Sequence, residues 1–397
     1  MKTILLLLSI IFLVGCNKST VDEPKPSAIK KDLFEINTDE IYKKQVINSK
    51  EKITSYNEFI SENYPSVFNE KIKKGSFVYS PYSYKMALEG LGTITKHFDG
   101  DDYLGFGVKE NLEKNLDNLV TKNAVILNKK FLDTKSNKFI LADFPKEAEK
   151  ISEKLQKEIL GEVLLNPDFK ASDLTTVIIN ATKFSGKWEK EFEKDNTENR
   201  DFRNINGEIV KKETMWGSID EKAIDNEEVS IGRKKLKEGG FVYFISPKNY
   251  DVNSLQKLSG KISSYIADFV DSDNDIKNDV NIYGLVELYA PKFNISSEID
   301  LLDIEEKAGH KKINEKFDLV DEIVNKTGEK TFISKITQVA NMMIDEEKVE
   351  AKAVTQMEAK NAAAPISKEL IIKCDRPHFV VTTSGNGIIN FIAFVGN

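Results

Sequence analysis

The sequence predicts an α+β fold, in which helices and strands occupy different parts of the chain. Helices dominate the first third, and helical periodicity is clearest just beyond it, over residues 146–160, where Ile151, Leu155 and Ile159 recur every four residues. Short apolar or alternating runs, which are typical of strands, dominate the last third. A doubly wound sheet would need strands and helices in regular alternation, which this chain does not show.

The elements follow one another in a mixed order. Helices are expected over residues 41–68, 81–96 and 146–160, and Pro145 suits the first turn of the last one. Strands are expected over residues 124–127, 175–179, 241–245, 285–290, 379–382 and 388–395. In the fourth strand, Val286, Leu288 and Ala290 would share one apolar face, because side chains alternate along a strand.

The N-terminal region is predicted to be an export signal with a lipid attachment site. Lys2 gives a basic start, and the apolar run over residues 4–14 is too short to span a bilayer, which takes about 20 residues. The run ends in Gly15-Cys16, which resembles the bacterial lipobox, so residues 1–15 would be removed and Cys16 acylated. The alternative is an ordinary signal peptide with an incidental cysteine. Asn17 after the cysteine favours the outer membrane of the cell envelope, with the periplasmic or the surface face left open.

The rest of the chain is predicted to be one domain on a flexible tether. Residues 16–36 are polar, contain Pro24 and Pro26, and show no periodicity. Residues 37–397 show no internal repeat and no second linker. Hydrophobic residues make up 40% and charged residues 30% of the chain, which suits a globular body. The net charge of −7 argues against a nucleic-acid partner, and we expect a monomer.

Catalytic and metal-binding motifs are not found. The sequence has no Gly-x-Ser-x-Gly elbow, P-loop or dinucleotide fingerprint, and its three histidines lack zinc-site spacing. Asp271, Asp273 and Asp275 have the opening spacing of a calcium loop, but Ile276 and Ile282 stand where glycine and glutamate are needed. The acidic residues are therefore interpreted as a solvated loop. We expect no metal, no cofactor and no enzyme, although a diffuse site of carboxylates stays open.

A stretch near the C-terminus has two faces when it is read as a strand. On one face lie Val349, Ala351, Ala353, Thr355, Met357 and Ala359. On the other lie Lys348, Glu350, Lys352, Gln356 and Glu358, with Val354 as the exception. The same residues are good helix formers, so the stretch could also be a plain surface helix or a linker. A sequence that suits both readings could be exposed in one state and a sheet strand in another.

Four motifs, taken in order, resemble those of the serpin family. They are Ser80-Pro81-Tyr82-Ser83, the block over residues 179–189, the run over residues 289–293, and Asp375-Arg376-Pro377. The second matches the family pattern Asn-Ala-x-x-Phe-x-Gly-x-Trp. The resemblance implies a fold of three β-sheets and eight or nine helices with an exposed reactive loop at about residues 346–370. It also implies a suicide inhibitor of serine or cysteine proteases, whose cleaved loop inserts into the central sheet and traps the acyl-enzyme.

The resemblance assigns a hinge to the start of that loop. The hinge comprises Glu346, Glu347, Lys348, Val349, Glu350, Ala351, Lys352 and Ala353. Val349 would be the first residue to turn inward, and its face carries no charge through Ala359. Lys348 stands where inhibitors usually have glycine, which keeps open a non-inhibitory serpin that acts as a surface binding protein.

Other roles are carried over position by position. Ser80, Ser83 and Asn180 match the shutter that controls opening of the central sheet, and Gln338 replaces a common shutter histidine, so its amide would make the hydrogen bond. Trp188 matches the breach where the loop first enters, and Lys292 would pair there with Glu346. Ordinary packing is the alternative for each. His378 stands where the C-terminal signature has phenylalanine.

The scissile bond is expected about sixteen residues beyond Glu346. That spacing indicates Ala362, followed by Ala363, and a small side chain there suits an elastase-like pocket. Lys360 would suit a trypsin-like protease, and Met357 is a third candidate. The expected partners are thus a target serine protease, bound covalently, and a membrane reached through the lipid anchor.

Overall fold

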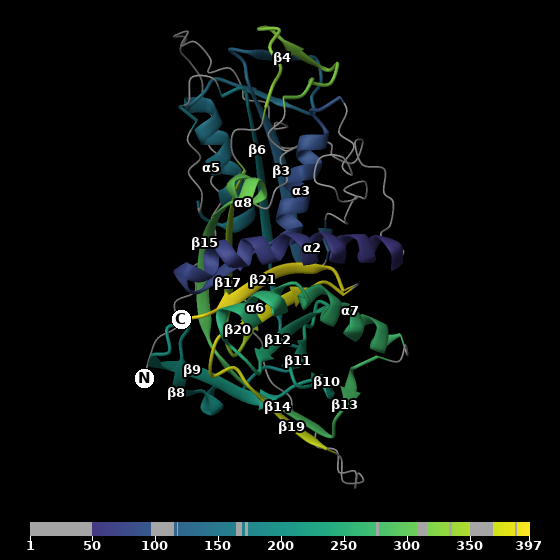
Figure 1. Cartoon of the computed structure of the whole chain (residues 1–397). Coiled ribbons are helices and arrows are strands. Elements are labelled where there is room, and N and C mark those ends of the chain that lie inside the picture. The colour runs from purple at the N-terminus through teal and green to yellow at the C-terminus, as the bar shows by residue number, and fades with distance from the viewer. Residues whose placement is uncertain are drawn as a thin grey trace, which may run out of the picture. The chain divides into compact units, whose positions relative to one another are not determined.

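Helix α2 (Lys50–Lys71) crosses the middle of the described structure and separates two groups of elements (Figure 1). The computed structural model describes residues 50–96, 115–116, 118–163, 169–170, 174–274, 278–307, 316–332, 336–349, 368–385 and 387–397. The other α-helices in these ranges are α3 (Pro81–Gly92), α5 (Lys146–Leu160), α6 (Val252–Ser259), α7 (Ile262–Asp273) and α8 (Leu301–Lys307). These make six α-helices within the described ranges, where the resemblance implies eight or nine for the whole chain.

A seven-stranded antiparallel sheet holds most of the core. Its order is β1 (Phe77–Tyr79), β21 (Ile389–Val395), β20 (His378–Thr383), β12 (Phe241–Pro247), β11 (Val229–Lys235), β10 (Lys222–Asp225) and β13 (Asn281–Ile282). Every residue of β20 and β21 is buried. Strands covered on both faces read as continuous apolar runs, which is why the sequence indicated these two clearly.

A second sheet has four strands. Its order is β19 (Glu369–Lys373), β14 (Leu285–Pro291), β9 (Ile209–Ser218) and β8 (Glu198–Arg203), and β19 runs parallel to β14. The predicted apolar face of β14 is confirmed, because Val286, Leu288 and Ala290 are each at most 1% exposed. We call this sheet the outer sheet.

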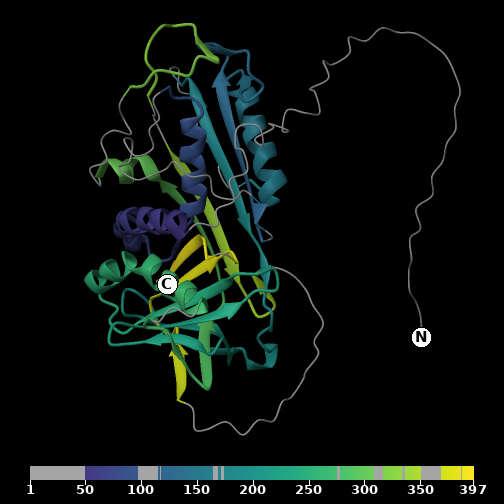
Figure 2. The same ribbon diagram turned by 90° about the vertical axis from the view of Figure 1, so that its right-hand side faces the viewer.

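Two further sheets follow. One contains β2 (Asn115–Leu116), β3 (Leu119–Asn128), β5 (Ile140–Ala142) and β6 (Thr176–Phe184). The other pairs β15 (Phe293–Asp300) with β17 (Thr337–Ile344). Two short pairs complete the strands, β4 (Leu132–Thr134) with β16 (Ile323–Asn325) and β7 (Gly186–Lys187) with β18 (Lys348–Val349). Strands β3 and β6 lie between α3 and α5 (Figure 2).

The start of α3 follows directly from its sequence. Ser80 caps the helix by accepting a hydrogen bond from the Ser83 amide at 3.1 Å, and Pro81 occupies the first turn. The predicted end at residue 96 is wrong by four residues. Gly92 and Thr93 are weak helix formers, and Thr95 instead makes an antiparallel bridge with Leu319.

The remaining element predictions hold with changed bounds. Helix α5 spans the expected residues, and all six expected strands are present. Strand β6 runs on to Phe184 because it pairs with β3 along its whole length. The predicted first helix begins, within the described residues, at Lys50 and continues to Lys71. No helix in the described part of the chain is long and apolar enough to cross a membrane.

His378 gives the fold a pH dependence. The residue is fully buried at the start of β20, its Nδ1 donates to the Arg376 carbonyl at 2.8 Å, and its Nε2 has no hydrogen-bond partner. Burial lowers the pKa of His378 from 6.5 to about 4. The unfolded chain therefore binds the extra proton between pH 6.5 and 4, and stability falls as the pH falls through that window.

We expect the variant His378→Phe to remove this loss. Its free energy of unfolding should fall by about 3 kcal/mol less than that of the natural chain between pH 7 and pH 4, because the shift of the His378 pKa disappears. Urea unfolding at both pH values measures the difference. Parallel pH profiles for the two proteins would show that His378 is not the titrating group.

Candidate functional site

The site is built around two strands that face each other without pairing. Within the described residues, β6 has β3 as its strand neighbour and β17 has β15, so the facing edges of β6 and β17 carry no ladder between them. A cavity of about 260 Å³ lies there, and its lining includes Thr182 and Phe184 from β6, Val339 and Met342 from β17, and Phe391 from β21. Unpaired edges of this kind can accept a further strand.

Polar contacts fix the position of the two strands near the start of β17. The Gln338 side chain makes two hydrogen bonds to the backbone of Ser80, accepting from its N–H at 2.9 Å and donating to its carbonyl at 2.8 Å. Ser80 Oγ donates to the carbonyl of Asn390 at 2.7 Å, and Ser83 Oγ donates to Asn180 Oδ1 at 2.5 Å. The structure thus brings together the four residues assigned to the shutter, and an amide makes the expected bond.

Trp188 joins the far ends of the same strands. Its side chain is fully buried, and Nε1 donates to the carbonyl of Asp345, just beyond β17, at 2.9 Å. The Phe192 ring packs edge-on against it at 5.7 Å between centroids, and the Phe192 amide donates to the Glu346 carbonyl at 2.9 Å. Gln338, near the start of β17, contacts α3, which in turn contacts Asn180 in the middle of β6. Asp345, just beyond the end of β17, contacts Trp188, which follows the end of β6. The two strands β6 and β17 therefore run in the same direction.

Glu346 is held by several partners at this end. Its Oε1 accepts a hydrogen bond from Thr197 at 2.7 Å and pairs with Lys292 at 3.2 Å, and Lys292 also pairs with Glu213 at 3.1 Å. Burial acts to raise the pKa of Glu346, but the bonds from Thr197 and Lys292 outweigh it and lower the pKa. The carboxylate therefore stays ionised, and the expected pair of Glu346 with Lys292 is present.

The chain turns back on itself after Glu347. Glu347 forms an ion pair with Lys194, and its amide donates to Asp345 Oδ1 at 3.0 Å. Strand β18 then pairs antiparallel with β7, with Lys348 opposite Lys187 and Val349 opposite Gly186. The first two residues after this turn thus already form a short strand beside β7, at the head of the space between β6 and β17.

Several partners at this site could not be found from the sequence. Thr197, Lys194 and Asp345 contribute through contacts between distant segments, and no local pattern marks them. Other predicted residues lie outside the described part of the chain. These are Cys16, Glu350, Ala351, Lys352, Ala353, Met357, Lys360, Ala362 and Ala363.

Comparison with known proteins decides the family. A family profile described as "Serpin (serine protease inhibitor)" matches residues 116–397. The chain belongs to the serpin family. Serpins are in general protease inhibitors rather than catalytic enzymes, and they bind target proteases.

Curated relatives and solved structures agree with this assignment. Antichymotrypsin-2 of Bombyx mori is 27% identical over 57% of this chain and 59% of its own length. Alpha-1-antiproteinase of Ovis aries is 25% identical over 75% of this chain and 73% of its own. The matches to Antichymotrypsin-2, to Serpin-ZXA of Oryza sativa and to Alaserpin of Manduca sexta span between 53% and 61% of those relatives.

The fold is also that of solved serpins. Serpin48 of the insect Tenebrio molitor superposes with a TM-score of 0.68 at 20% identity, over 88% of this chain and 99% of that structure. The thermophilic serpin Tengpin in its native state gives a TM-score of 0.69 at 19% identity, over 88% and 95%. The α+β serpin fold that the sequence predicted is therefore confirmed, with several β-sheets in the described ranges.

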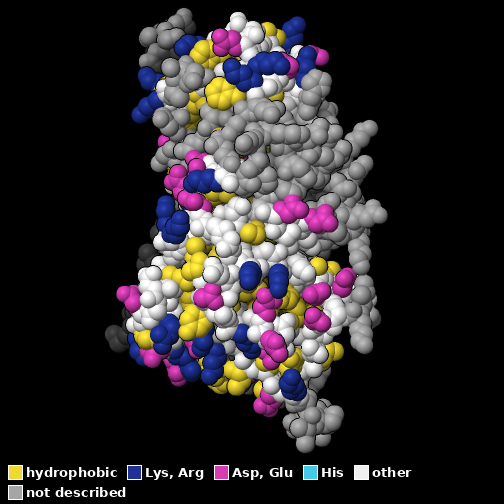
Figure 3. Space-filling view, viewed as in Figure 1, with side chains coloured by type: hydrophobic (Ala, Val, Ile, Leu, Met, Phe, Trp, Pro, Cys, Tyr) yellow, Lys and Arg dark blue, Asp and Glu magenta, His cyan; other side chains and the backbone are white. Residues whose placement is uncertain are grey.

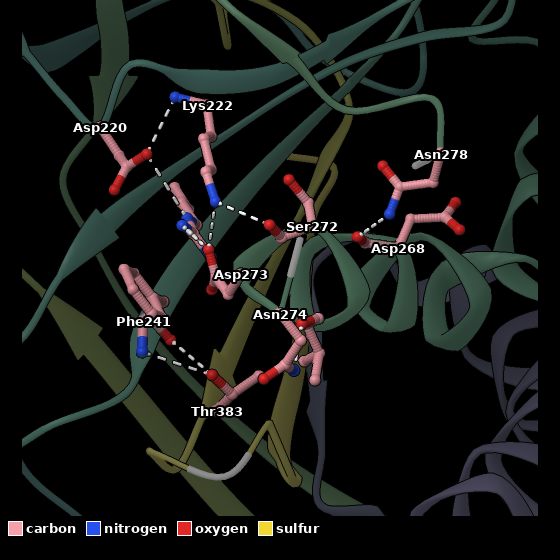
Figure 4. A network of polar contacts seen from close by, with 11 residues as sticks. Asp220, Lys222, Phe241, Asp268, Ser272, Asp273, Asn274, Asn278 and Thr383 are labelled. Carbon is pink, nitrogen blue, oxygen red and sulfur yellow. Dashed lines mark hydrogen bonds and ion pairs between the residues drawn. The ribbon is translucent and has the colours of Figure 1, made fainter. Parts of the chain in front are cut away.

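The acidic end of α7 has a structural role in this serpin. Asp273 makes two hydrogen bonds with the buried guanidinium of Arg233, at 2.6 and 2.8 Å, and pairs with Lys222 at 2.8 Å (Figure 4). Asp275 lies outside the described residues. In the described ranges, no group of three or more His, Cys, Asp or Glu side chains is placed to hold a metal ion. The predicted solvated loop is thus wrong for Asp273, which joins α7 to β11.

Lys234 is a buried cation beside Trp188. Its residue is 4% exposed, and its Nζ lies 4.2 Å from the Phe192 ring centroid, with the Ser218 carbonyl at 3.5 Å. Burial, helped by repulsion from Lys190, lowers the pKa of Lys234 from 10.5 to about 8. Below pH 8 both the folded and the unfolded chain carry this proton, so the full cost of burial is present at neutral pH.

We expect Lys234→Met to stabilise the folded serpin. Its free energy of unfolding should rise by about 3 kcal/mol at pH 7, because the burial of a charge is removed while the length of the side chain is kept. The gain should shrink between pH 8 and 10.5, where the natural lysine loses its proton on folding. Urea unfolding measures both effects. Lys235→Met is the matched control, since Lys235 is half exposed. A destabilised Lys234→Met would contradict this account.

Proposed function

We propose that this serpin is a single-use inhibitor of serine proteases, which traps its target by inserting its cleaved loop between β6 and β17. One observation carries the proposal. Strand β18 pairs antiparallel with β7 at the head of the space between two strands that face each other unpaired. Because β6 and β17 run in the same direction, a strand continuing from β18 would be antiparallel to both and could form a ladder on each edge.

The register of β18 predicts which residues would meet. Val349 lies opposite Gly186, so continuing the ladder places Ala351 opposite Phe184 and Ala353 opposite Thr182. Two residues further, Thr355 would lie opposite Asn180. Residues that are opposite in a ladder share a face of the sheet, so the faces of β6 decide where the loop side chains would point.

The core-facing side of β6 would receive the small and apolar side chains of the loop, and its other side would receive the charged ones. Asn180 bonds to Ser83 of α3, and Phe184 packs against Phe391 at 6.5 Å between ring centroids, so this face of β6 looks into the core. The loop residues that would join it are small or apolar. The charged residues of the loop would point toward the α5 side. An unpaired charge on the inner face would cost several kcal/mol, and the sequence avoids one through Ala359.

The trapping reaction needs no cofactor from this chain. The hydroxyl of the protease's serine attacks the carbonyl carbon of Ala362, the bond to the Ala363 nitrogen breaks, and that amine leaves with the proton. The ester that remains links inhibitor and protease until water hydrolyses it. Insertion must therefore be faster than hydrolysis. Ala362 favours an elastase-like target, with Lys360 and Met357 as alternative sites.

A lipid anchor and the tether would place this inhibitor at the cell envelope. Acylation of Cys16 would hold the serpin, as a monomer, on the outer membrane, with residues 16–36 as a spacer. The trap would then protect the cell's own envelope rather than clear proteases at a distance.

Pancreatic elastase tests the proposed function. We expect a band at the summed mass of serpin and elastase in a denaturing gel, and mass spectrometry of the released fragment should show Ala363 as its first residue. Trypsin and chymotrypsin, run in parallel, test Lys360 and Met357. Complete cleavage by all three proteases, with each left fully active, would exclude an inhibitory role.

The alternative is a non-inhibitory serpin. Its supporting observation is that Lys348 lies directly opposite Lys187, and like charges opposite each other weaken a strand pair. Among the structural relatives, thyroxine-binding globulin was solved in complex with thyroxine, at 18% identity to this chain and a TM-score of 0.67. This alternative predicts cleavage without trapping and no stabilisation after cleavage.

A further inference from the structure

The chain on both sides of the undescribed segment 350–367 contacts the outer sheet, at opposite ends of one strand. On one side, Glu346 pairs at 3.2 Å with Lys292, which directly follows β14. On the other side, the Gly284 amide, directly before β14, donates to the Lys368 carbonyl at 3.0 Å. Strand β14 has 7 residues and so spans about 23 Å. The outer sheet therefore contacts the chain shortly before and directly after the reactive loop.

The outward face of this sheet carries large apolar side chains. Leu370 and Ile372 of β19 are buried at 8% and 0%, whereas Ile371 between them is 53% exposed. Leu285 of β14 is 37% exposed. Further along the same face, the Trp216 ring stacks on the Tyr289 ring at 5.8 Å between centroids. We call Leu285, Ile371, Tyr289 and Trp216 the outer-face stripe.

The composition of the outer-face stripe is that of a protein-binding surface. The guanidinium of Arg200 lies over the Tyr289 ring at 4.6 Å. Trp, Tyr and Arg are the residues that contribute most to binding energy at protein interfaces. The space-filling view shows hydrophobic side chains at the surface over this region, among charged ones of both signs (Figure 3). Apolar surface rimmed by charge is typical of interaction sites.

The short segment between Ala362 and Lys368 limits how far a bound protease can lie from this surface. Ala362 is six residues before Lys368 (368 minus 362), which is at most about 20 Å of extended chain. A protease whose active site holds Ala362 is itself larger than that distance. The part of the serpin within reach of its body includes the end of β14 and β19 next to Lys368, which carries Leu285 and Ile371.

We propose that the outer-face stripe is a docking surface for the body of the target protease, and that it contacts an apolar area beside the protease's active-site cleft. This inference rests on the proposed function, because it takes the protease to be the occupant. The outer-face stripe would speed capture without affecting the trap, since insertion takes place between β6 and β17. The charges beside it, Arg200, Lys373, Glu287 and Glu369, balance in number, so capture should depend only weakly on salt.

The experiment compares second-order rate constants for inhibition of pancreatic elastase by the full chain. We expect the double variant Leu285→Ser/Ile371→Ser to capture elastase about tenfold more slowly, with the same number of serpin molecules consumed per protease and the same unfolding temperature. The conservative variant Ile371→Val should stay within twofold of the natural chain. The matched control is Val324→Ser, because Val324 is 48% exposed on β16, which pairs with β4 at the opposite end of Figure 1.

The outcomes separate the two proposals. A double variant that inhibits as fast as Val324→Ser would overturn the docking surface while leaving the inhibitory function in place. A loss of rate that comes with more serpin consumed per protease would also overturn it, since the outer-face stripe would then act on the trap. If the natural chain forms no covalent complex with elastase, the proposed function fails, and the docking inference fails with it.

Discussion

Cleavage of the loop is expected to raise the unfolding temperature of this serpin by about 20 °C or more. Insertion of the residues from Glu350 to Ala359 between β6 and β17 would add about twenty ladder hydrogen bonds, about ten on each edge, each contributing about 1 kcal/mol. It would also bury the small face of the loop and close the cavity of about 260 Å³ between the strands. A gain of about 20 kcal/mol shifts the unfolding temperature of a domain of this size by about 20 to 30 °C, because the unfolding entropy is roughly 2 cal/mol/K per residue.

Calorimetry of the intact and the elastase-nicked chain measures this shift. The intact protein should unfold at the lower temperature, because the facing edges of β6 and β17 are unpaired in it. The variant Lys234→Met gives a useful reference, because its expected rise in unfolding temperature is smaller than that caused by insertion and does not depend on cleavage. Equal unfolding temperatures before and after cleavage would support the non-inhibitory alternative.

If the chain is the inhibitor that we propose, a single charge on the inner face of its loop is expected to turn it into a substrate. In the register that β18 begins, Ala353 would lie opposite Thr182 on the core side of β6. The variant Ala353→Asp would place an unpaired carboxylate there, at a cost of about 3 to 5 kcal/mol. If the activation free energy of insertion rises by that amount, insertion slows by a hundredfold or more, and hydrolysis of the acyl-enzyme is then faster than trapping.

The neighbouring residue supplies the control. Val354→Asp carries the same charge one residue later, where the side chain would point toward α5 and solvent. We expect Ala353→Asp to be cleaved at the natural rate while inhibiting almost no elastase, and Val354→Asp to inhibit nearly as well as the natural chain. Titration of elastase activity against added serpin measures both. Equal effects of the two variants would mean that the loop does not insert with this alternation.

Sequence reasoning succeeded best where a segment is buried on both faces or carries a family motif. Strands β20 and β21 are continuous apolar runs, and the block that contains Asn180 and Trp188 is specific to the family. The contact between Gln338 and Ser80 was predicted from the shutter positions alone. Each of these depends on residues that the sequence marks locally.

The strands and the turn that sequence reasoning missed form because of contacts with segments that are distant in the sequence. Strand β15 reads Phe-Asn-Ile-Ser-Ser-Glu-Ile-Asp, which is too polar to indicate a strand, and it forms because it pairs with β17 over all 8 residues. Strand β8 is mostly charged and is stabilised by β9 in the same way. The turn that reverses the chain at Glu347 depends on Lys194 and Trp188, which lie far away in the sequence. No local pattern could have shown that the hinge already pairs with β7.

The structure of the elastase-nicked chain tests the central claim most directly. We expect a crystal structure of that form to show residues 349–359 as a strand between β6 and β17, antiparallel to both, with Thr355 opposite Asn180. The small residues of the loop should then face α3, and the charged residues should face α5. A nicked chain in which β6 and β17 remain unpaired, with the loop outside the sheet, would contradict the account.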